Sequence, residues 1–249
     1  VRPTNRGRYR ASFTSDANLM SRRYTGFCLT GSKSITTKQS YMNALIVGAT
    51  GTGKSANVII PSILSMAKSG HSLVINDPSS ELYQKTSGAL HKEYSYVVKR
   101  LDLNDPERSC HYNPLARVQT FSDMRKVASL VVRSSLGHTR SDPFWSLSAV
   151  NLLSCLLALL HTQGDYTWHM AGVRHLLIKC AADPATLDPL FARHANEVLF
   201  DEWLAIQSLD EKVRAGVIAT CKAALDLWSD EHIAALTSID DLELESLRD

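Results

Sequence analysis

Gly48-Ala49-Thr50-Gly51-Thr52-Gly53-Lys54-Ser55 is the stretch on which the interpretation of this chain depends. It fits the phosphate-binding loop pattern, in which a glycine and four further residues precede Gly-Lys-Ser or Gly-Lys-Thr. Its glycines let the backbone approach phosphate groups closely, so that successive N–H groups point at them. The pattern predicts a nucleotide site in which Lys54 reaches the β- and γ-phosphates and the Ser55 hydroxyl ligates Mg²⁺.

The flanking residues fit the strand, loop and helix that the motif requires. Residues 42–47 end in an apolar run with the length of a buried strand, and residues 56–67 can continue as a helix. Pro61 interrupts this helix, because proline removes a backbone hydrogen bond. We therefore expect a kink near Ile60 or a helix that restarts at Pro61. The alternative is a flexible loop that holds Gly-Lys-Ser by chance.

The charge of the 249-residue chain is unevenly distributed, although the formal net charge is only +2. Up to Lys38 the only acid is Asp16, whereas residues 226–249 are strongly acidic. A basic arm can attract nucleic acid or an anionic membrane surface. A solvated tail is the alternative.

Cysteine and histidine patterns favour neither a disulfide framework nor a zinc site. The five cysteines are widely spaced without a Cys-x-x-Cys pair, and His-Glu-x-x-His is absent.

The longest apolar run, residues 147–160, is shorter than the roughly 20 residues that span a bilayer, so we expect no transmembrane segment. The first residues do not resemble a signal peptide. The chain begins with Val1 rather than Met, which suggests a processed, trimmed or partial product.

The pattern of elements predicts an α/β fold followed by a helical region. Residues 72–78 and 94–101 read as strands with a helix over 81–90 between them, and this alternation implies a parallel sheet. Few strand signals occur between residues 120 and 236, where all four tryptophans lie. The predicted organisation is a basic arm (1–40), a P-loop nucleotide-binding portion (41–118), an all-α subdomain (119–236) and a return segment (237–249).

Hydrolysis requires an acid that holds Mg²⁺. Asp77 is the only acid that ends a good apolar strand in the α/β portion, and it is the candidate catalytic residue beside Lys54. The alternative role for Asp77 is to cap a turn before Pro78. Because no apolar strand ends in Asp-Glu, we expect further strands of the nucleotide domain to follow Asp249.

Several spaced segments resemble one family. They are the phosphate-binding loop followed by Asn57-Val58-Ile59-Ile60-Pro61, then Asn76-Asp77-Pro78-Ser79-Ser80-Glu81-Leu82, Asn113-Pro114-Leu115, Asp142-Pro143-Phe144-Trp145, the stretch from Leu225 to Trp228, and Asp240-Asp241. Together they are similar to the cytoplasmic ATPase of type IV secretion coupling proteins, the TraG/TraD-like conjugation proteins. Ser79-Ser80 departs from the usual Lys-Gly of the family. From the resemblance, we expect the membrane anchor and the Walker B strand of the family to lie outside this stretch of sequence.

The resemblance implies a RecA-like P-loop ATPase with ATP and Mg²⁺ as cofactors, its parallel sheet incomplete in this chain and interrupted by an inserted all-α subdomain. It further implies a homo-hexamer in the full-length parent, at the cytoplasmic face of the bacterial inner membrane. The implied partners are inner-membrane components of the secretion system, DNA, and a relaxase or protein substrate recognised by residues 119–236.

Two other functions fit parts of the sequence. The chain can be a protein- or DNA-binding module whose nucleotide loop does not support hydrolysis, since the second acid is missing. It can also be a small-molecule kinase with a helical lid. A kinase lid needs arginines directed at the phosphates, and the arginines at 133, 140, 174, 193 and 214 form no obvious cluster.

Overall fold

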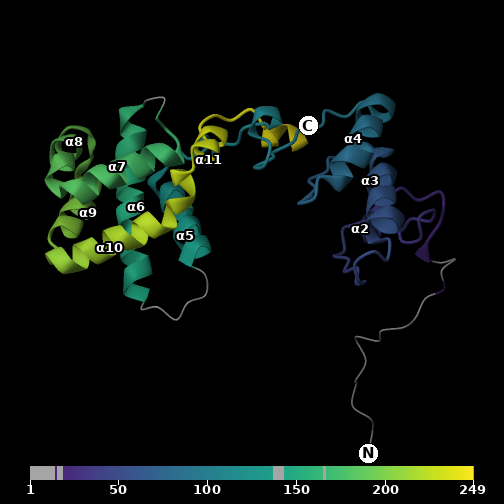
Figure 1. Cartoon of the computed structure of the whole chain (residues 1–249), viewed down its shortest axis with the longest axis horizontal. Helices are drawn as coiled ribbons and strands as arrows, with labels where there is room; N and C mark the ends of the chain where they lie inside the picture. The colour runs from purple at the N-terminus through teal and green to yellow at the C-terminus, as the bar shows by residue number, and fades with distance from the viewer. Residues whose placement is uncertain (1–14, 16–18, 137–142, 165–166, 249) are drawn as a thin grey trace, which may run out of the picture. The chain divides into compact units, whose positions relative to one another are not determined.

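The computed structural model describes residues 15, 19–136, 143–164 and 167–248. The chain divides into two compact units, the first made of residues 1–98 and 244–249 and the second of residues 99–243. Both units are built from helices and irregular segments (Figure 1). Residues 1–14 and 16–18 of the predicted basic arm lie outside the described residues. The four-part division by role made from the sequence stays a prediction.

The predicted RecA-like parallel sheet is wrong for this chain. The described residues contain no β-strand, only isolated bridges of Ser34 with Ser21 and with Cys28. The segments expected as strands are irregular at 43–49, 71–77 and 95–102. Several of their apolar side chains are exposed, with 89% of Leu45 and 82% of both Val74 and Val97 open to solvent, whereas Leu73, Tyr96 and Val98 pack partly buried against a small hydrophobic cluster of the first unit. An apolar run becomes a strand only when a neighbouring strand accepts its ladder hydrogen bonds, and none does so here.

The first unit contains four short helical segments and one longer helix. They are α2 (Thr37–Ser40), the π-helical turn η1 (Ser55–Ile59), α3 (Ile60–Ala67), α4 (Glu81–Tyr94) and the 3₁₀ turn η5 (Leu244–Arg248). Helices α3 and α4 pack together through a small buried cluster of Ile63, Ala67, Leu82 and Leu90. This cluster places the residues that follow the phosphate-binding loop against a second helix.

The helix after the loop changes form at the place that the sequence predicts. The Ile60 N–H donates to the Ser55 carbonyl, five residues back, so that η1 is a π-helical turn. Helix α3 then begins at Ile60, with Pro61 in its first turn. Proline has no N–H to donate, and the first turn of a helix is where this costs least. The sequence predicted a kink near Ile60 or a restart at Pro61; the helix instead changes from π to α form at Ile60 with right-handed helical backbone at Ile59 and Ile60.

The second unit is a bundle around helix α6. Its elements are η2 (Pro106–Arg108), α5 (Phe121–Leu136), α6 (Pro143–Gln163), α7 (Met170–Ala182), η3 (Pro184–Leu187), α8 (Asp188–His194), α9 (Glu197–Gln207), α10 (Glu211–Ala224), η4 (Asp226–Ser229) and α11 (Glu231–Leu236). Helix α6 contacts α5, α7, α8, α9 and α10 (Figure 1).

Helix α6 carries apolar residues on nearly every side, and neighbouring helices of the unit cover nearly every side of it. Buried residues run almost without interruption from Ala149 to Leu160. The helix is long and apolar enough to cross a membrane by length and composition, but 61% of its most apolar window is buried inside the protein. The core helix of a globular protein is also long and apolar, and the burial of α6 matches that of a core helix.

All five cysteines are free thiols, and three of them lie in the core of the second unit. Burial raises the pKa of Cys155 to about 12 and that of Cys180 to about 11, and it raises the pKa of Cys221 still further. Desolvation disfavours the thiolate, which is the reactive form. These cysteines therefore act as small core side chains.

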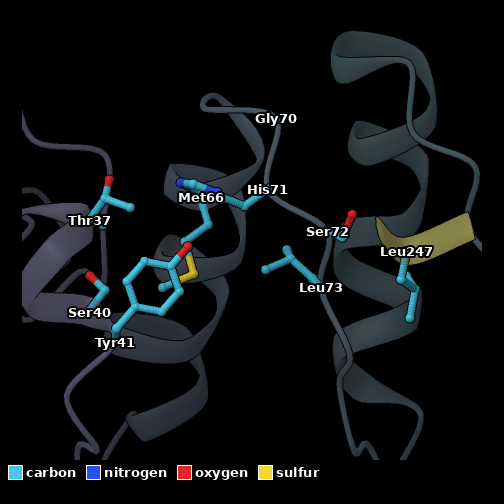
Figure 2. Close-up of a pocket in the computed structure, with 10 residues that line it drawn as sticks. Thr37, Ser40, Tyr41, Met66, Gly70, His71, Ser72, Leu73 and Leu247 are labelled. Atoms are coloured by element: carbon cyan, nitrogen blue, oxygen red, sulfur yellow. The ribbon is translucent and has the colours of Figure 1, made fainter. Parts of the chain in front are cut away.

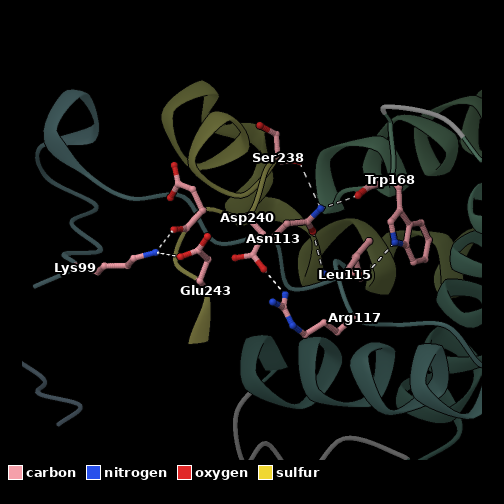
Figure 3. A network of polar contacts seen from close by, with 9 residues as sticks. Lys99, Asn113, Leu115, Arg117, Trp168, Ser238, Asp240 and Glu243 are labelled. Atoms are coloured by element: carbon pink, nitrogen blue, oxygen red, sulfur yellow. Dashed lines mark hydrogen bonds and ion pairs between the residues drawn. The ribbon is translucent and has the colours of Figure 1, made fainter. Parts of the chain in front are cut away.

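The two ends of the second unit are joined by polar contacts, which we call the end clasp. Lys99 Nζ lies 2.5 Å from Glu243 Oε2 and donates to the Asp241 carbonyl at 2.8 Å (Figure 3). Asp241 accepts hydrogen bonds from the backbone N–H of His111 at 2.6 Å and from its Nδ1 at 2.8 Å. These bonds hold the pKa of the Asp241 carboxyl below its usual value.

Asn113 and Arg117 extend the clasp toward the bundle. The Asn113 amide donates to the carbonyls of Trp168 at 2.8 Å and Ser238 at 3.4 Å (Figure 3). Arg117 forms an ion pair with Asp240. The first and last segments of the unit are thus fixed to one another, as expected of an inserted domain whose ends lie close together.

Substituting Gly216 tests the packing of the bundle. A Cβ at Gly216 in α10 would lie 2.5 Å from Trp145 Cζ3. We expect Gly216→Ala to lower the free energy of unfolding by about 1–3 kcal/mol, since the indole ring has to move. Thermal and urea unfolding measure the change. Gly88→Ala in α4 is the matched control: a Cβ there meets no atom within 4 Å, and we expect a gain of roughly 0.5–1 kcal/mol. Equal effects of the two substitutions would contradict the packing described here.

The N-terminal cap of helix α7 predicts that the stability of the protein depends on pH. His169 Nδ1 accepts a hydrogen bond from the Gly172 N–H at 3.2 Å, which requires that this nitrogen be unprotonated. Burial lowers the pKa of His169 in the folded state. The stabilisation is complete above the unfolded-state value of about 6.5, and it is lost as the pH falls through the lower folded-state pKa. Unfolding measured from pH 7.5 to 5 should show a smaller pH dependence for His169→Asn, because asparagine caps without titrating. Identical profiles would show that the cap is not pH-sensitive.

Candidate functional site

The phosphate-binding loop lies at the start of the η1–α3 helix, with residues 48–52 exposed to solvent. Gly51 and Gly53 both have φ of +81°, in the left-handed region that disfavours a side chain. At Gly51 a Cβ would meet no atom within 4 Å, so the backbone dihedral alone requires glycine there. The backbone of this loop thus requires glycine at the motif position Gly53 and at Gly51, which the motif leaves variable.

Lys54 closes the loop on itself. Its Nζ donates to the Gly48 carbonyl at 2.6 Å and to the Ala49 carbonyl at 2.8 Å. The Thr52 hydroxyl also donates to Ala49, at 2.8 Å. The ammonium therefore lies across the loop, within reach of the first and second loop residues. A phosphate at this position would compete with those two carbonyls for the same cation.

Ser55 and Asn57 come from the π-helical turn that follows the loop. Ser55 is its first residue. The Asn57 N–H donates to the Gly53 carbonyl at 2.8 Å. A Cβ at Gly53 would lie 2.6 Å from Asn57 Nδ2, so the asparagine side chain covers this glycine. No sequence pattern indicates this role of Asn57, because the role depends on the turn geometry.

Asp77 is bonded to the first turn of helix α4. Its Oδ2 accepts from the Tyr83 N–H at 2.9 Å, and its Oδ1 accepts from the Ser79 hydroxyl at 3.3 Å. Ser80, at the N-cap position, has φ of +57° and makes no side-chain cap. Asp77 therefore supplies a carboxylate that caps this helix, whereas the alternative weighed from the sequence was a cap on a turn before Pro78. Within the described residues, no hydrogen bond or ion pair of Asp77 reaches the loop, and its catalytic role stays a prediction.

A separate pocket of about 420 Å³ lies at the other end of α3. Its wall includes Tyr41, Met66, His71 and Leu73 (Figure 2). Met66 is eleven residues beyond Ser55, which corresponds to about 16 Å along a helix. This pocket is therefore distinct from the phosphate-binding loop, and neither Lys54 nor Asp77 lines it.

The loop fits a phosphate-bound Mg²⁺ better than a metal held by protein side chains alone. In the described part of the chain, no group of three or more His, Cys, Asp or Glu residues is placed to hold a metal ion. Mg²⁺ commonly takes one or two protein oxygens together with phosphate oxygens and water. The Ser55 hydroxyl can supply such an oxygen.

Comparison with known proteins gives consistent matches. The family model described as type IV secretory system conjugative DNA transfer matches residues 9–249. Protein VirD4 of Rhizobium radiobacter is 27% identical over 220 residues, which cover 83% of this chain and 30% of VirD4. The chain thus spans about 30% of the length of that relative.

The capping role of Asp77 can be tested by substitution. We expect Asp77→Ala to reduce the stability of the first unit by about 0.5–2 kcal/mol, the range for loss of a helix N-cap. Asp77→Asn retains an oxygen acceptor and should lose less. Urea unfolding followed by circular dichroism measures both. If Asp77→Ala were as stable as the wild type, the contact with α4 would not contribute to folding.

Proposed function

The chain belongs to the type IV secretory system conjugative DNA transfer family, and we propose that its phosphate-binding loop binds ATP with Mg²⁺. The single observation that carries this proposal is the geometry of residues 48–55. Two left-handed glycines shape the loop, and Lys54 lies across it. This is the arrangement in which a lysine and backbone N–H groups can hold a polyphosphate.

Each residue of the loop has a defined part in this proposal. Lys54 exchanges the carbonyls of Gly48 and Ala49 for the β- and γ-phosphates. The Ser55 hydroxyl ligates Mg²⁺, which offsets phosphate charge when it is bound. Gly51 and Gly53 keep the backbone close to the phosphates, where a side chain would disturb the turn.

We further propose that the whole protein acts as a coupling ATPase at the cytoplasmic face of the bacterial inner membrane. In this role it assembles as a hexamer, contacts inner-membrane components of the secretion system and works on DNA. The helical bundle, within residues 119–236, recruits a relaxase or protein substrate. These roles rest on family membership, and they extend beyond the 30% of VirD4 that the chain matches.

A specific observation favours a second candidate, a module that binds nucleotide without hydrolysing it. The carboxylate of Asp77, the acid expected to help with Mg²⁺, is used to cap helix α4. ATP hydrolysis by this chain alone would contradict this second candidate. Hydrolysis that is lost in Asp77→Asn, with binding retained, would support a catalytic role for Asp77.

The proposal is tested by the binding of a fluorescent ATP analogue in the presence and absence of Mg²⁺. We expect Lys54→Ala to weaken binding about 10- to 100-fold, since a charge-assisted contact contributes about 1.5–3 kcal/mol. Lys68→Ala is the control, because Lys68 is an exposed lysine at the far end of α3. Equal affinity of the wild type and Lys54→Ala would refute the nucleotide site.

A further inference from the structure

The pocket at the C-terminal end of α3 has the size of a small-ligand site. Its volume of about 420 Å³ falls within the roughly 300–1,000 Å³ that is typical of ligand pockets. One wall comes from α2 and Tyr41, a second from residues between Met66 and Leu73, and Leu247 of η5 completes it. All of these residues belong to the first unit, so the pocket lies within one compact part of the chain.

Hydrogen bonds between distant segments hold the two main walls in place. The Ser40 hydroxyl at the end of α2 accepts from the Phe27 N–H at 2.7 Å and donates to the Thr36 carbonyl at 3.0 Å. In the other wall, the Tyr96 hydroxyl donates to the His71 carbonyl at 2.7 Å. The pocket is therefore formed before any ligand arrives, as is usual for binding sites.

Tyr41 offers this pocket a flat aromatic face. The residue is 81% exposed, although it lines the pocket. Figure 2 shows the Leu73 side chain pointing toward the Tyr41 ring, and Met66 lines the same pocket. Nucleobases stack on exposed aromatic rings of this kind in proteins that bind single-stranded nucleic acid. A planar ligand would thus find one stacking surface and apolar neighbours.

Polar side chains of the pocket keep their capacity for hydrogen bonds. Within the described part of the chain, the side chains of Thr37 and His71 form no hydrogen bond, and both line the pocket. A hydroxyl and a neutral imidazole can each donate and accept, and the edges of a nucleobase carry both donors and acceptors. No aspartate, glutamate, lysine or arginine is among the described residues that line the pocket. The wall therefore suits an uncharged, planar, hydrogen-bonding group.

The charge of the surrounding chain favours a base that is attached to phosphates. Residues 19–76 supply every lining residue except Leu247, and they contain no aspartate or glutamate. The same stretch contains six basic residues: Arg22, Arg23, Lys33, Lys38, Lys54 and Lys68. A segment with this balance attracts a polyanion such as a nucleic-acid strand, whereas it does not attract a neutral small molecule.

We propose that this pocket binds one base of single-stranded nucleic acid, with the base stacked on Tyr41 and its edge hydrogen-bonded by Thr37 and His71. The inference rests on the part of the proposed function in which the whole protein works on DNA, and it adds the place where a base is held. Bases of an intact duplex are stacked and paired, so the pocket accepts only an unpaired base. Free nucleosides share this chemistry, and the experiment separates the two sources.

The test measures the binding of a labelled short oligothymidylate by fluorescence anisotropy at low salt. We expect Tyr41→Ala to weaken binding about 10-fold, the order found when a stacking aromatic is removed. Tyr41→Phe keeps the ring and should stay near the wild type. Tyr24→Ala is the matched control, because Tyr24 is another exposed tyrosine of the first unit and does not line the pocket. Equal melting temperatures verify that the variants are folded.

An abasic strand of the same length isolates the contribution of the base, since it keeps the phosphates. The wild type should bind the abasic strand about 10-fold more weakly than the oligothymidylate. Tyr41→Ala should bind both strands equally, because its stacking surface is gone. If Tyr41→Ala still preferred the oligothymidylate by the same factor as the wild type, the base would be held elsewhere and the inference would be wrong.

The remaining outcomes separate this inference from the nucleotide site. We expect Lys54→Ala to lose Mg-ATP binding and keep oligothymidylate binding, and Tyr41→Ala to show the reverse. If Tyr41→Ala matches Tyr24→Ala with the oligothymidylate, the role of the pocket is refuted and the nucleotide site stands. If Tyr41→Ala weakens Mg-ATP instead, the pocket belongs to the nucleotide site. If free thymidine binds as tightly as the strand, the ligand is a nucleoside, and the inference is overturned.

Discussion

The burial of helix α6 is the constraint on which the second unit depends. A helix that is apolar on nearly every side is stable in water only when other elements cover it. Helices α5, α7, α8, α9 and α10 provide that cover, and the core of the unit gathers around residues 149–160. Because the cover comes from both earlier and later parts of the chain, the two ends of the unit return to one place. The end clasp holds them there through ion pairs and hydrogen bonds of Lys99, His111 and Arg117 with Glu243, Asp241 and Asp240.

The first unit is stabilised in a different way from the second. Its buried cluster consists of four residues of α3 and α4, so it gains less from apolar burial than the bundle does. Polar tethers contribute instead. Ser62 and Ser65 attach residues 26–35 to α3, and Asp77 caps α4. The phosphate-binding loop depends on this small framework, since the π-helical turn that carries Ser55 and Asn57 continues directly into α3.

The two halves of the sequence differed in how well they could be interpreted. The helices between residues 120 and 236 follow from apolar spacing, which a covered helix has to show. The change of helix form near Ile60 lies where proline chemistry led us to expect a kink or a restart. The strands expected at 42–47, 72–78 and 94–101 were wrong, because a strand depends on a partner that local sequence does not specify. Asp77 was predicted as a catalytic acid because it follows one of those segments. In the structure its carboxylate contacts helix α4 instead.

The sequence by itself determined the motif of residues 48–55, the resemblance to the family and the helical bundle, because each depends on short-range spacing of glycine, proline, lysine and apolar residues. Of the two fixed glycines of the motif, Gly53 has a left-handed backbone, and so does Gly51 at a variable position. Only the tertiary structure decided that Asp77 caps α4, that Lys54 lies on the carbonyls of Gly48 and Ala49, and that residues 26–35 attach to α3. The last of these depends on contacts between segments 34 residues apart, such as that of Cys28 with Ser62. Such contacts form only when packing brings the segments together.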